Sequence, residues 1–201
     1  MTDGPFDTGR IRRRLEGLAR DPIEQWHDRG DFEHVDLESA AVLIPITERD
    51  GEFYLVFTHR SDDLEKHSGE VSFPGGRPEP EDNTLVETAL RESHEEIALL
   101  PGDVEVFGAL TELPTVTGFE IVSYVGEFPS PYELVPSPRE IETLFQAPLS
   151  ELADPANHRL EEREFGGQTY PVHYFEYDGH VIWGATGFLL DSLLRYLDLK
   201  A

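Results

Sequence analysis

The sequence predicts a mixed α/β fold in which a mixed β-sheet is sandwiched between α-helices. Short apolar runs such as Ala40–Ile46 occur between longer amphipathic segments such as Thr84–Leu99, without a strict strand–helix–strand order. The 201 residues, of which 38% are hydrophobic, suffice to bury one core. We therefore predict a helical leader over residues 1–38 and one globular domain over residues 39–201.

The individual elements follow from the apolar periodicity. In the leader, Ile11, Leu15 and Leu18 recur at helical spacing beside a cluster of arginines, which predicts an amphipathic helix with a solvated basic face. Ala40–Ile46 and Phe53–Thr58 flank a turn and predict a hairpin. A long polar loop leads from there to the helix Thr84–Leu99, which ends before a Pro-Gly pair. Further strands are expected at Val104–Leu110, Ile121–Phe128, Ile141–Phe145, Glu162–Phe165 and Tyr170–Tyr177. A short helix is expected before Asp154 and a last helix at Ala185–Leu197. Trp183 and Tyr170 are expected in the core.

The charge of the chain is unusual. Its 41 acidic and 16 basic residues give a formal net charge of −25, and lysine occurs only as Lys66 and Lys200. Such a surface disfavours nucleic acid and anionic membranes as partners. The acids are spread along the whole chain instead of forming a tail, which favours adaptation to high salt over an ordinary acidic protein. Since cysteine, a membrane-length apolar run and a signal-like N-terminus are absent from the sequence, we expect a cytoplasmic protein in a high-salt cell, without disulfides or thiolate metal sites.

Candidate chemistry lies on the helix predicted over Thr84–Leu99. Glu92, Glu95 and Glu96 share one edge of this helix, where their mutual repulsion would be relieved by a hard divalent cation such as Mg²⁺ or Mn²⁺. Arg91 lies four residues before Glu95 and is placed to pair with it. Taken alone, three glutamates in so acidic a chain indicate a solvated helix face. The Gly75-Gly76 pair just upstream shifts the balance towards a site, because consecutive glycines let the backbone approach a ligand closely.

The segment from Gly76 to Leu99, GRPEPEDNTLVETALRESHEEIAL, resembles the Nudix box. The resemblance implies a hydrolase that uses the glutamates of the REXXEE core to bind metal. Three departures stand out: Ala98 replaces the usual glycine, Asp82 replaces the usual glutamate, and the spacing from Gly76 to Arg91 is one residue longer than the commonest one. The last two put the role of Asp82 in doubt.

The preceding segment, LVFTHRSDDLEKHSGEVSFPGG, resembles the extra motif of the coenzyme A pyrophosphatase branch of Nudix hydrolases. This branch hydrolyses the pyrophosphate of coenzyme A or its acyl forms to 3′,5′-ADP and 4′-phosphopantetheine or its acyl form. The resemblance implies substrate-binding roles for Arg60, His67, Gly75 and Gly76, with a surface ion pair for Arg60 and a structural role for His67 as the plain alternatives. It also implies metal binding by Glu92, Glu95 and Glu96, and catalytic roles for these three together with Arg91. Glu140 is expected as an extra carboxylate that acts as a ligand or base, with a solvated glutamate as the plain alternative.

Two other functions remain open at this stage. The first keeps the Nudix chemistry and changes the substrate to NADH, ADP-ribose or a nucleoside triphosphate. The second is a catalytically silent Nudix-fold binding module, against which the three intact glutamates argue. We expect a small nucleotide-type substrate, no nucleic acid and no membrane as partner, and keep a homodimer as an open alternative.

Overall fold

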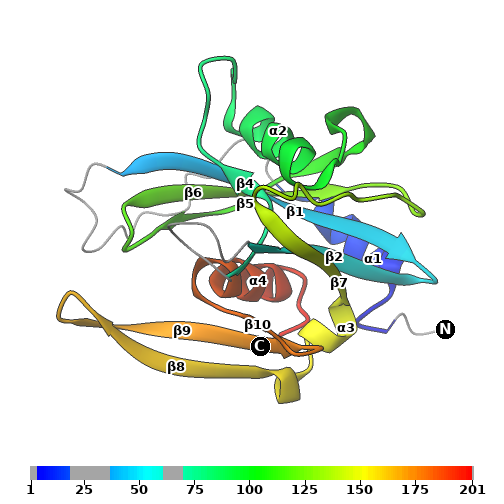
Figure 1. The fold of residues 1–201 in the computed structure, drawn as a ribbon. Helices are drawn as coiled ribbons and strands as arrows, with labels where there is room; N and C mark the ends of the chain where they lie inside the picture. Colours follow the sequence, from blue (N-terminus) through cyan, green and yellow to red (C-terminus); the bar gives the residue numbers. More distant parts are fainter. Residues whose placement is uncertain (1–3, 19–36, 61–69, 201) are drawn as a thin grey trace.

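The structure, a computed structural model, describes residues 4–18, 37–60 and 70–200. It has the predicted mixed α/β architecture. The helix α2 (Leu85–Ile97) covers one face of a large sheet, and α4 (Gly184–Tyr196) lies against the other face, between that sheet and a small second sheet (Figure 1). Among the described residues, no helix is long and apolar enough to cross a membrane.

The large sheet has seven strands and mixed pairing, as predicted. Its centre is β1, which runs parallel to β6 and antiparallel to β2 and β4, while β5, β3 and β7 extend the sheet through antiparallel pairs. The strands are β1 (Glu38–Arg49), β2 (Glu52–Arg60), β3 (Val71–Ser72), β4 (Gly75–Gly76), β5 (Glu105–Pro114), β6 (Phe119–Glu127) and β7 (Ile141–Pro148). The expected hairpin of the first two strands is confirmed, but the expected loop between Arg60 and Asn83 contains β3 and β4.

Strand β1 divides the apolar core into two halves. Ala41 and Leu43 point towards α2, whereas Ile44 and Ile46 contribute to the cluster that also includes the apolar face of α4. All four side chains are buried because the strand lies at the middle of the sheet. Successive side chains alternate between the faces of a strand, so β1 fixes the position of α2 on one side and of α4 on the other.

Helix α2 begins and ends at identifiable caps. The Thr84 hydroxyl accepts a hydrogen bond from the backbone N–H of Glu87 at 3.3 Å, and the Glu87 carboxylate accepts one from the backbone N–H of Asn83 at 2.7 Å. The helix ends at Ala98, which adopts a left-handed conformation with φ of 57°. Ala89 and Ile97 face the core and are fully buried, and Leu85 packs at its margin.

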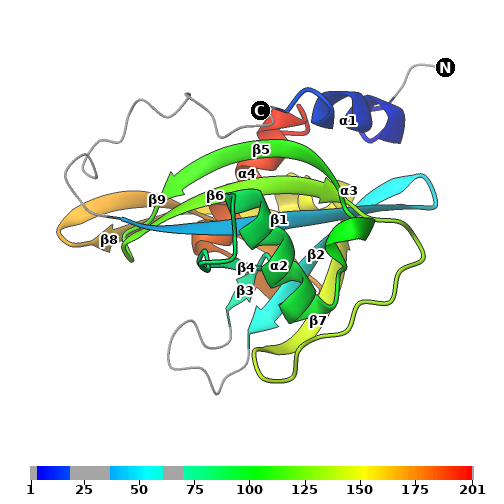
Figure 2. The same ribbon diagram turned by 90° about the horizontal axis from the view of Figure 1, so that it is seen from above.

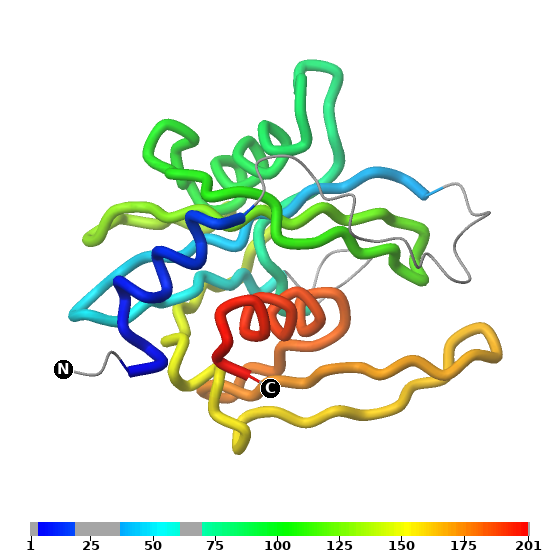
Figure 3. Tube along the Cα trace, turned by 180° about the vertical axis from the view of Figure 1, so that it is seen from behind, coloured from blue at the N-terminus to red at the C-terminus, as the bar shows by residue number. Residues whose placement is uncertain are grey.

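The predicted leader helix is α1 (Thr8–Leu15), and it buries Ile11 and Leu15 in the same core as α4. Its basic residues are largely engaged within the chain: Arg12 pairs with Glu127 and Glu48, and Arg14 pairs with Asp198. Figures 2 and 3 show α1 beside the C-terminal end of the chain, where these contacts form. The basic cluster therefore anchors the helix to the domain.

The rest of the chain forms the second sheet and its connections. Its strands are β8 (His158–Phe165), β9 (Gln168–Tyr177) and β10 (His180–Ile182). The helix α3 (Leu149–Leu152) and a 3-10 turn (Pro155–Asn157) lead to it from β7, and another 3-10 turn (Pro101–Asp103) lies between α2 and β5. The strands expected at Glu162–Phe165 and Tyr170–Tyr177 are confirmed and pair antiparallel as β8 and β9, with β8 longer than expected and β10 in addition. The expectation of core positions for Trp183 and Tyr170 is wrong: Trp183 is 41% exposed and stacks on Tyr174, and Tyr170 is only half-buried.

Candidate active site

The glutamate edge of α2 lies directly over the glycine pair of β4. The Glu96 carboxylate accepts a hydrogen bond from the backbone N–H of Gly75 at 3.3 Å. The Glu92 carboxylate lies so close to Gly76 that a Cβ on this glycine would stand 2.3 Å from Glu92 Oε1. Two carboxylates one helical turn apart therefore meet at two consecutive backbone positions.

The structure requires a glycine at positions 75 and 76 for two different reasons. A Cβ on Gly75 would stand 2.4 Å from the carbonyl oxygen of Ala41 and 2.6 Å from the Cα of Val42, so the missing side chain lets β4 pair with β1. The three heavy atoms nearest to a Cβ on Gly76 would all belong to the end of the Glu92 side chain. Gly75 thus permits the pairing of β4 with β1, and Gly76 leaves space for the Glu92 carboxylate.

Arg91 organises the outer part of this edge. Its guanidinium donates to Glu92 at 3.0 Å and to Glu95 at 3.1 Å, so the contact expected with Glu95 is present. It also donates through Nε and Nη2 to Asp82, at 3.0–3.3 Å, and to the carbonyl of Arg77. Arg91 therefore joins the loop before α2 to the carboxylates on the helix.

Asp82 is the residue whose part in the site the sequence left in doubt. Besides Arg91, its carboxylate accepts hydrogen bonds from the Thr88 hydroxyl and from the backbone N–H of Glu79, both at 2.9 Å. These contacts, with Arg91 the strongest, lower the pKa of Asp82 to about 2. The side chain is only 6% exposed. Asp82 is thus a positioning residue that holds the Arg91 guanidinium.

Glu96 is the most enclosed carboxylate of the group, with a side chain that is 2% exposed. Burial raises its pKa to about 7, although Arg60, whose Nη1 lies 3.2 Å from Glu96 Oε1, lowers it in part. The negative charges of Glu92 and Glu140 raise it further. Burial likewise raises the pKa of Glu92, against the opposing effect of Arg91.

Glu140 reaches the same site from another part of the chain. The backbone N–H of Ser137 donates to the carbonyl of Glu96 at 2.8 Å, and that of Glu140 donates to Ser137 at 3.1 Å. These bonds fix the turn before β7 against the C-terminal end of α2. Glu140 is exposed, and its charge raises the pKa of both Glu92 and Glu96.

The structure therefore brings together most of the residues singled out from the sequence. These residues are Arg60, Gly75, Gly76, Arg91, Glu92, Glu95, Glu96 and Glu140. Glu95 is the outermost of the glutamates, with a side chain that is 54% exposed. His67 lies outside the described residues. Sequence reasoning missed the clamp of Asp82 on Arg91, for which the only signal was an acid at a shifted position in the box.

The donor set fits a hard divalent cation. Burial is the main cause of the raised pKa values of Glu92 and Glu96; neighbouring negative charges add to it, and Arg91 and Arg60 offset it only in part. A divalent cation with oxygen preference would remove this cost. No thiolate or imidazole is among the described residues that carry the site, so the set matches Mg²⁺ or Mn²⁺ better than a softer metal.

The fold and this site define a metal-dependent hydrolase of the Nudix class. The chain belongs to this family: the family model for the NUDIX domain matches residues 37–166. Members of the family generally use divalent cations, and membership indicates a pyrophosphohydrolase.

Individual relatives agree with the assignment. A Nudix hydrolase called NudL, from Yersinia enterocolitica, is 38% identical over 160 residues, which cover 80% of this chain and 82% of the relative. Nudix hydrolase 15, a mitochondrial protein of Arabidopsis thaliana, is 39% identical over 158 residues, which cover 75% of this chain and 55% of the relative. The crystal structure of a MutT/nudix family protein from Enterococcus faecalis has a similar fold, with a TM-score of 0.52, 12% identity and coverage of 86% of this chain and 67% of that protein.

Proposed function

We propose that this Nudix hydrolase cleaves the pyrophosphate bond of coenzyme A or acyl-CoA to 3′,5′-ADP and 4′-phosphopantetheine or its acyl form, with Mg²⁺ or Mn²⁺ as cofactor. The observation that carries the hydrolytic part is the convergence of Glu92 and Glu96 on the Gly75-Gly76 pair. The substrate rests on the resemblance of Leu55–Gly76 to the coenzyme A pyrophosphatase motif.

In this proposal Glu92 and Glu96 hold the cation, with Glu95 completing the acidic edge. A bound divalent cation supplies charge neutralisation at the pyrophosphate oxygens. Arg91 is a positioning residue, because its guanidinium is committed to Asp82, Glu92 and Glu95. Its replacement would let the outer carboxylates separate.

Arg60 is proposed as a contact for the phosphates of the substrate. One of its terminal nitrogens bonds Glu96, and its buried Nε has no acceptor among the described residues. A guanidinium has five donors in a planar fork that suits phosphate oxygens. Since the site contains more carboxylates than guanidiniums, such a contact would matter mainly for substrate affinity.

Glu140 is proposed as the proton acceptor for the attacking water or as a further ligand to the cation. It is exposed and close enough to raise the pKa of both inner glutamates. The variant Glu140→Gln separates the two roles. Loss of a base removes the acidic limb of the kcat profile with unchanged Mn²⁺ affinity, whereas loss of a ligand weakens Mn²⁺ binding.

The reaction is tested with a panel of substrates in Mg²⁺ and in Mn²⁺: coenzyme A, an acyl-CoA, dephospho-coenzyme A, NADH, ADP-ribose and deoxynucleoside triphosphates. We expect the highest kcat/KM with coenzyme A or the acyl-CoA, and Arg60→Ala should mainly raise KM. A kcat/KM at least tenfold higher for any of the other compounds would overturn the substrate assignment and leave the Nudix chemistry standing.

The metal site is tested separately with Glu92→Gln and Glu96→Gln. Each should lower turnover by orders of magnitude, since a neutral amide is a poor ligand for a hard cation. Glu87→Gln is the matched control: it makes the same change on the same helix, and the amide oxygen can still accept from Asn83. Turnover like the wild type in both site variants at saturating Mg²⁺ would remove these glutamates from the mechanism and favour a silent binding module.

A further inference from the structure

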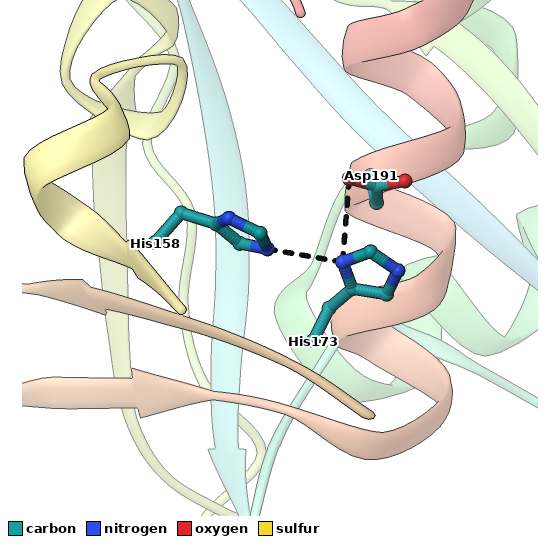
Figure 4. Close-up of side chains that lie close together, drawn as sticks. All are labelled: His158, His173 and Asp191. Atoms are coloured by element: carbon teal, nitrogen blue, oxygen red, sulfur yellow. Dashed lines mark hydrogen bonds and ion pairs between the residues drawn. The ribbon is translucent and has the colours of Figure 1, made fainter. Parts of the chain in front are cut away.

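A second group of metal-ligating side chains lies on the opposite side of the large sheet from the glutamates. His158 at the start of β8, His173 on β9 and Asp191 on α4 point towards one another (Figure 4). Their ligand atoms all lie within 4.8 Å of one another. His158 Nε2 is 3.0 Å from His173 Nδ1, which in turn is 3.3 Å from Asp191 Oδ1.

We infer that His158, His173 and Asp191 form a binding site for a divalent transition metal of the zinc type, separate from the hydrolytic site. Two imidazoles and one carboxylate are a donor set for zinc and similar metals, whereas the glutamates of α2 offer only oxygen. One chain would thus hold two cations of different chemical preference.

Two of the three separations between the ligand atoms match those around a single metal ion, and the third is at most 4.8 Å. Ligands at 2.0–2.1 Å from a tetrahedral zinc ion stand about 3.4 Å apart. The distance from His158 Nε2 to His173 Nδ1, 3.0 Å, and the distance from His173 Nδ1 to Asp191 Oδ1, 3.3 Å, are close to this value. A neutral imidazole carries one N–H, and which nitrogen of the His158–His173 pair carries the shared hydrogen depends on the tautomer. With the hydrogen on His173 Nδ1, His158 and Asp191 compete for it; with the hydrogen on His158 Nε2, His173 offers none to Asp191 Oδ1. A metal ion would satisfy all three donor atoms at once.

The backbone holds these three elements together at this point. A Cβ on Gly187 would stand 2.5 Å from the carbonyl oxygen of His173, so this glycine lets α4 approach β9. Asp191 follows Gly187 by four residues and therefore lies on the same face of the helix. Asp191 is buried and the two histidines are half-buried, which leaves a route for an ion.

A lysine competes with a metal for this site. Lys200 donates to Asp191 Oδ1, the same oxygen that faces His173, while Arg195 holds the other oxygen at 2.7 Å. A metal ion would replace the ammonium of Lys200 on Oδ1 and leave Arg195 as the outer partner that orients the carboxylate.

The site is tested by titrating the full chain with Co²⁺, whose visible absorption reports tetrahedral coordination, and by displacing it with Zn²⁺. We expect one such Co²⁺ per chain. The signal should disappear in His158→Gln and in His173→Gln and persist in Glu92→Gln, which alters only the hydrolytic site. Persistence in both histidine variants, loss in Glu92→Gln, or no tetrahedral signal in the wild type would overturn the inference.

Lys200→Met provides a test that does not depend on removing a ligand. In the wild type, a metal ion must first displace the charged hydrogen bond between Lys200 and Asp191. Without this bond, Co²⁺ and Zn²⁺ should bind about tenfold more tightly, which corresponds to about 1.4 kcal/mol. Zn²⁺ should also raise the melting temperature of the wild type and of Lys200→Met, because it ties β8 and β9 to α4. Equal affinity in the wild type and Lys200→Met would contradict the competition and with it the proposed geometry.

Discussion

Replacing Gly76 with alanine should impair catalysis while leaving the fold in place. The new Cβ would stand 2.3 Å from Glu92 Oε1 and 2.9 Å from Oε2, whereas ordinary contacts begin at 3.4 Å. The obstacle is the end of a side chain, so the Glu92 carboxylate can retreat by about 1 Å. A displacement of about 1 Å at a catalytic group costs roughly 100-fold in rate, or about 2.7 kcal/mol of transition-state stabilisation.

The assay compares kcat/KM, Mn²⁺ affinity and the free energy of unfolding for three alanine variants. Gly76→Ala should lose activity and Mn²⁺ affinity with little loss of stability. Gly75→Ala should lose stability by about 1–3 kcal/mol, because its Cβ would meet the backbone of β1. Gly102→Ala, at a position with no heavy atom within 4 Å, is the control and should resemble the wild type.

The reasoning fails if Gly76→Ala keeps the kcat/KM of the wild type, since the carboxylate of Glu92 would then not need its place beside β4. It also fails if Gly76→Ala unfolds like Gly75→Ala, because the contact would then be structural. Hydrolysis of coenzyme A is the readout when the proposed substrate holds, and Mn²⁺ affinity tests the geometry independently of the substrate.

Three further predictions concern stability. Ala98→Gly should raise the free energy of unfolding by about 1 kcal/mol, because glycine tolerates a φ of 57° that strains alanine. Urea titration measures this free energy, and an unchanged or lower value for the variant would contradict the prediction. Without divalent cations, the free energy of unfolding of the wild type should fall by on the order of 3 kcal/mol as pH rises from about 4.5 to 7, because the folded state keeps the Glu96 proton after the unfolded state has released it. The free energy of unfolding of Glu96→Gln should fall by less over the same range. Parallel pH–stability curves for the two proteins would exclude Glu96 as the cause. The melting temperature should rise with KCl into the molar range, because the net charge of −25 is screened when the Debye length falls to about 3 Å; a flat or falling curve would refute the salt adaptation.

The sequence predicted those parts of the fold that local patterns specify. Helix α2 was found because its apolar period and the Pro-Gly pair after Leu100 agree with one another. Strands β3 and β4 were missed because each has only two residues and exists through pairing with β2 and β1. Tertiary contacts, rather than the propensity of Gly75 or Gly76, create β4.

The same distinction applies to the sites. The glutamates of α2 were found because helical spacing places them on one edge. The bond between Asp82 and Arg91 joins a loop to a helix, and no periodicity links residues in that relation. His158, His173 and Asp191 come from two strands and a helix, so only the folded chain brings them together. Trp183 was misplaced because a large aromatic side chain was expected inside, whereas it stacks on the outer face of a sheet.

The charge balance of the hydrolytic site argues for strict dependence on a divalent cation. Arg91 is occupied by Asp82, Glu92 and Glu95, and Arg60 is bonded to Glu96, while Glu140 adds further negative charge. The carboxylates therefore outnumber the guanidiniums even before an anionic pyrophosphate arrives. High salt screens exposed charges but acts far less on buried ones such as Glu96. Monovalent salt should thus stabilise the acidic surface without replacing the divalent cation that a pyrophosphate needs to enter this site.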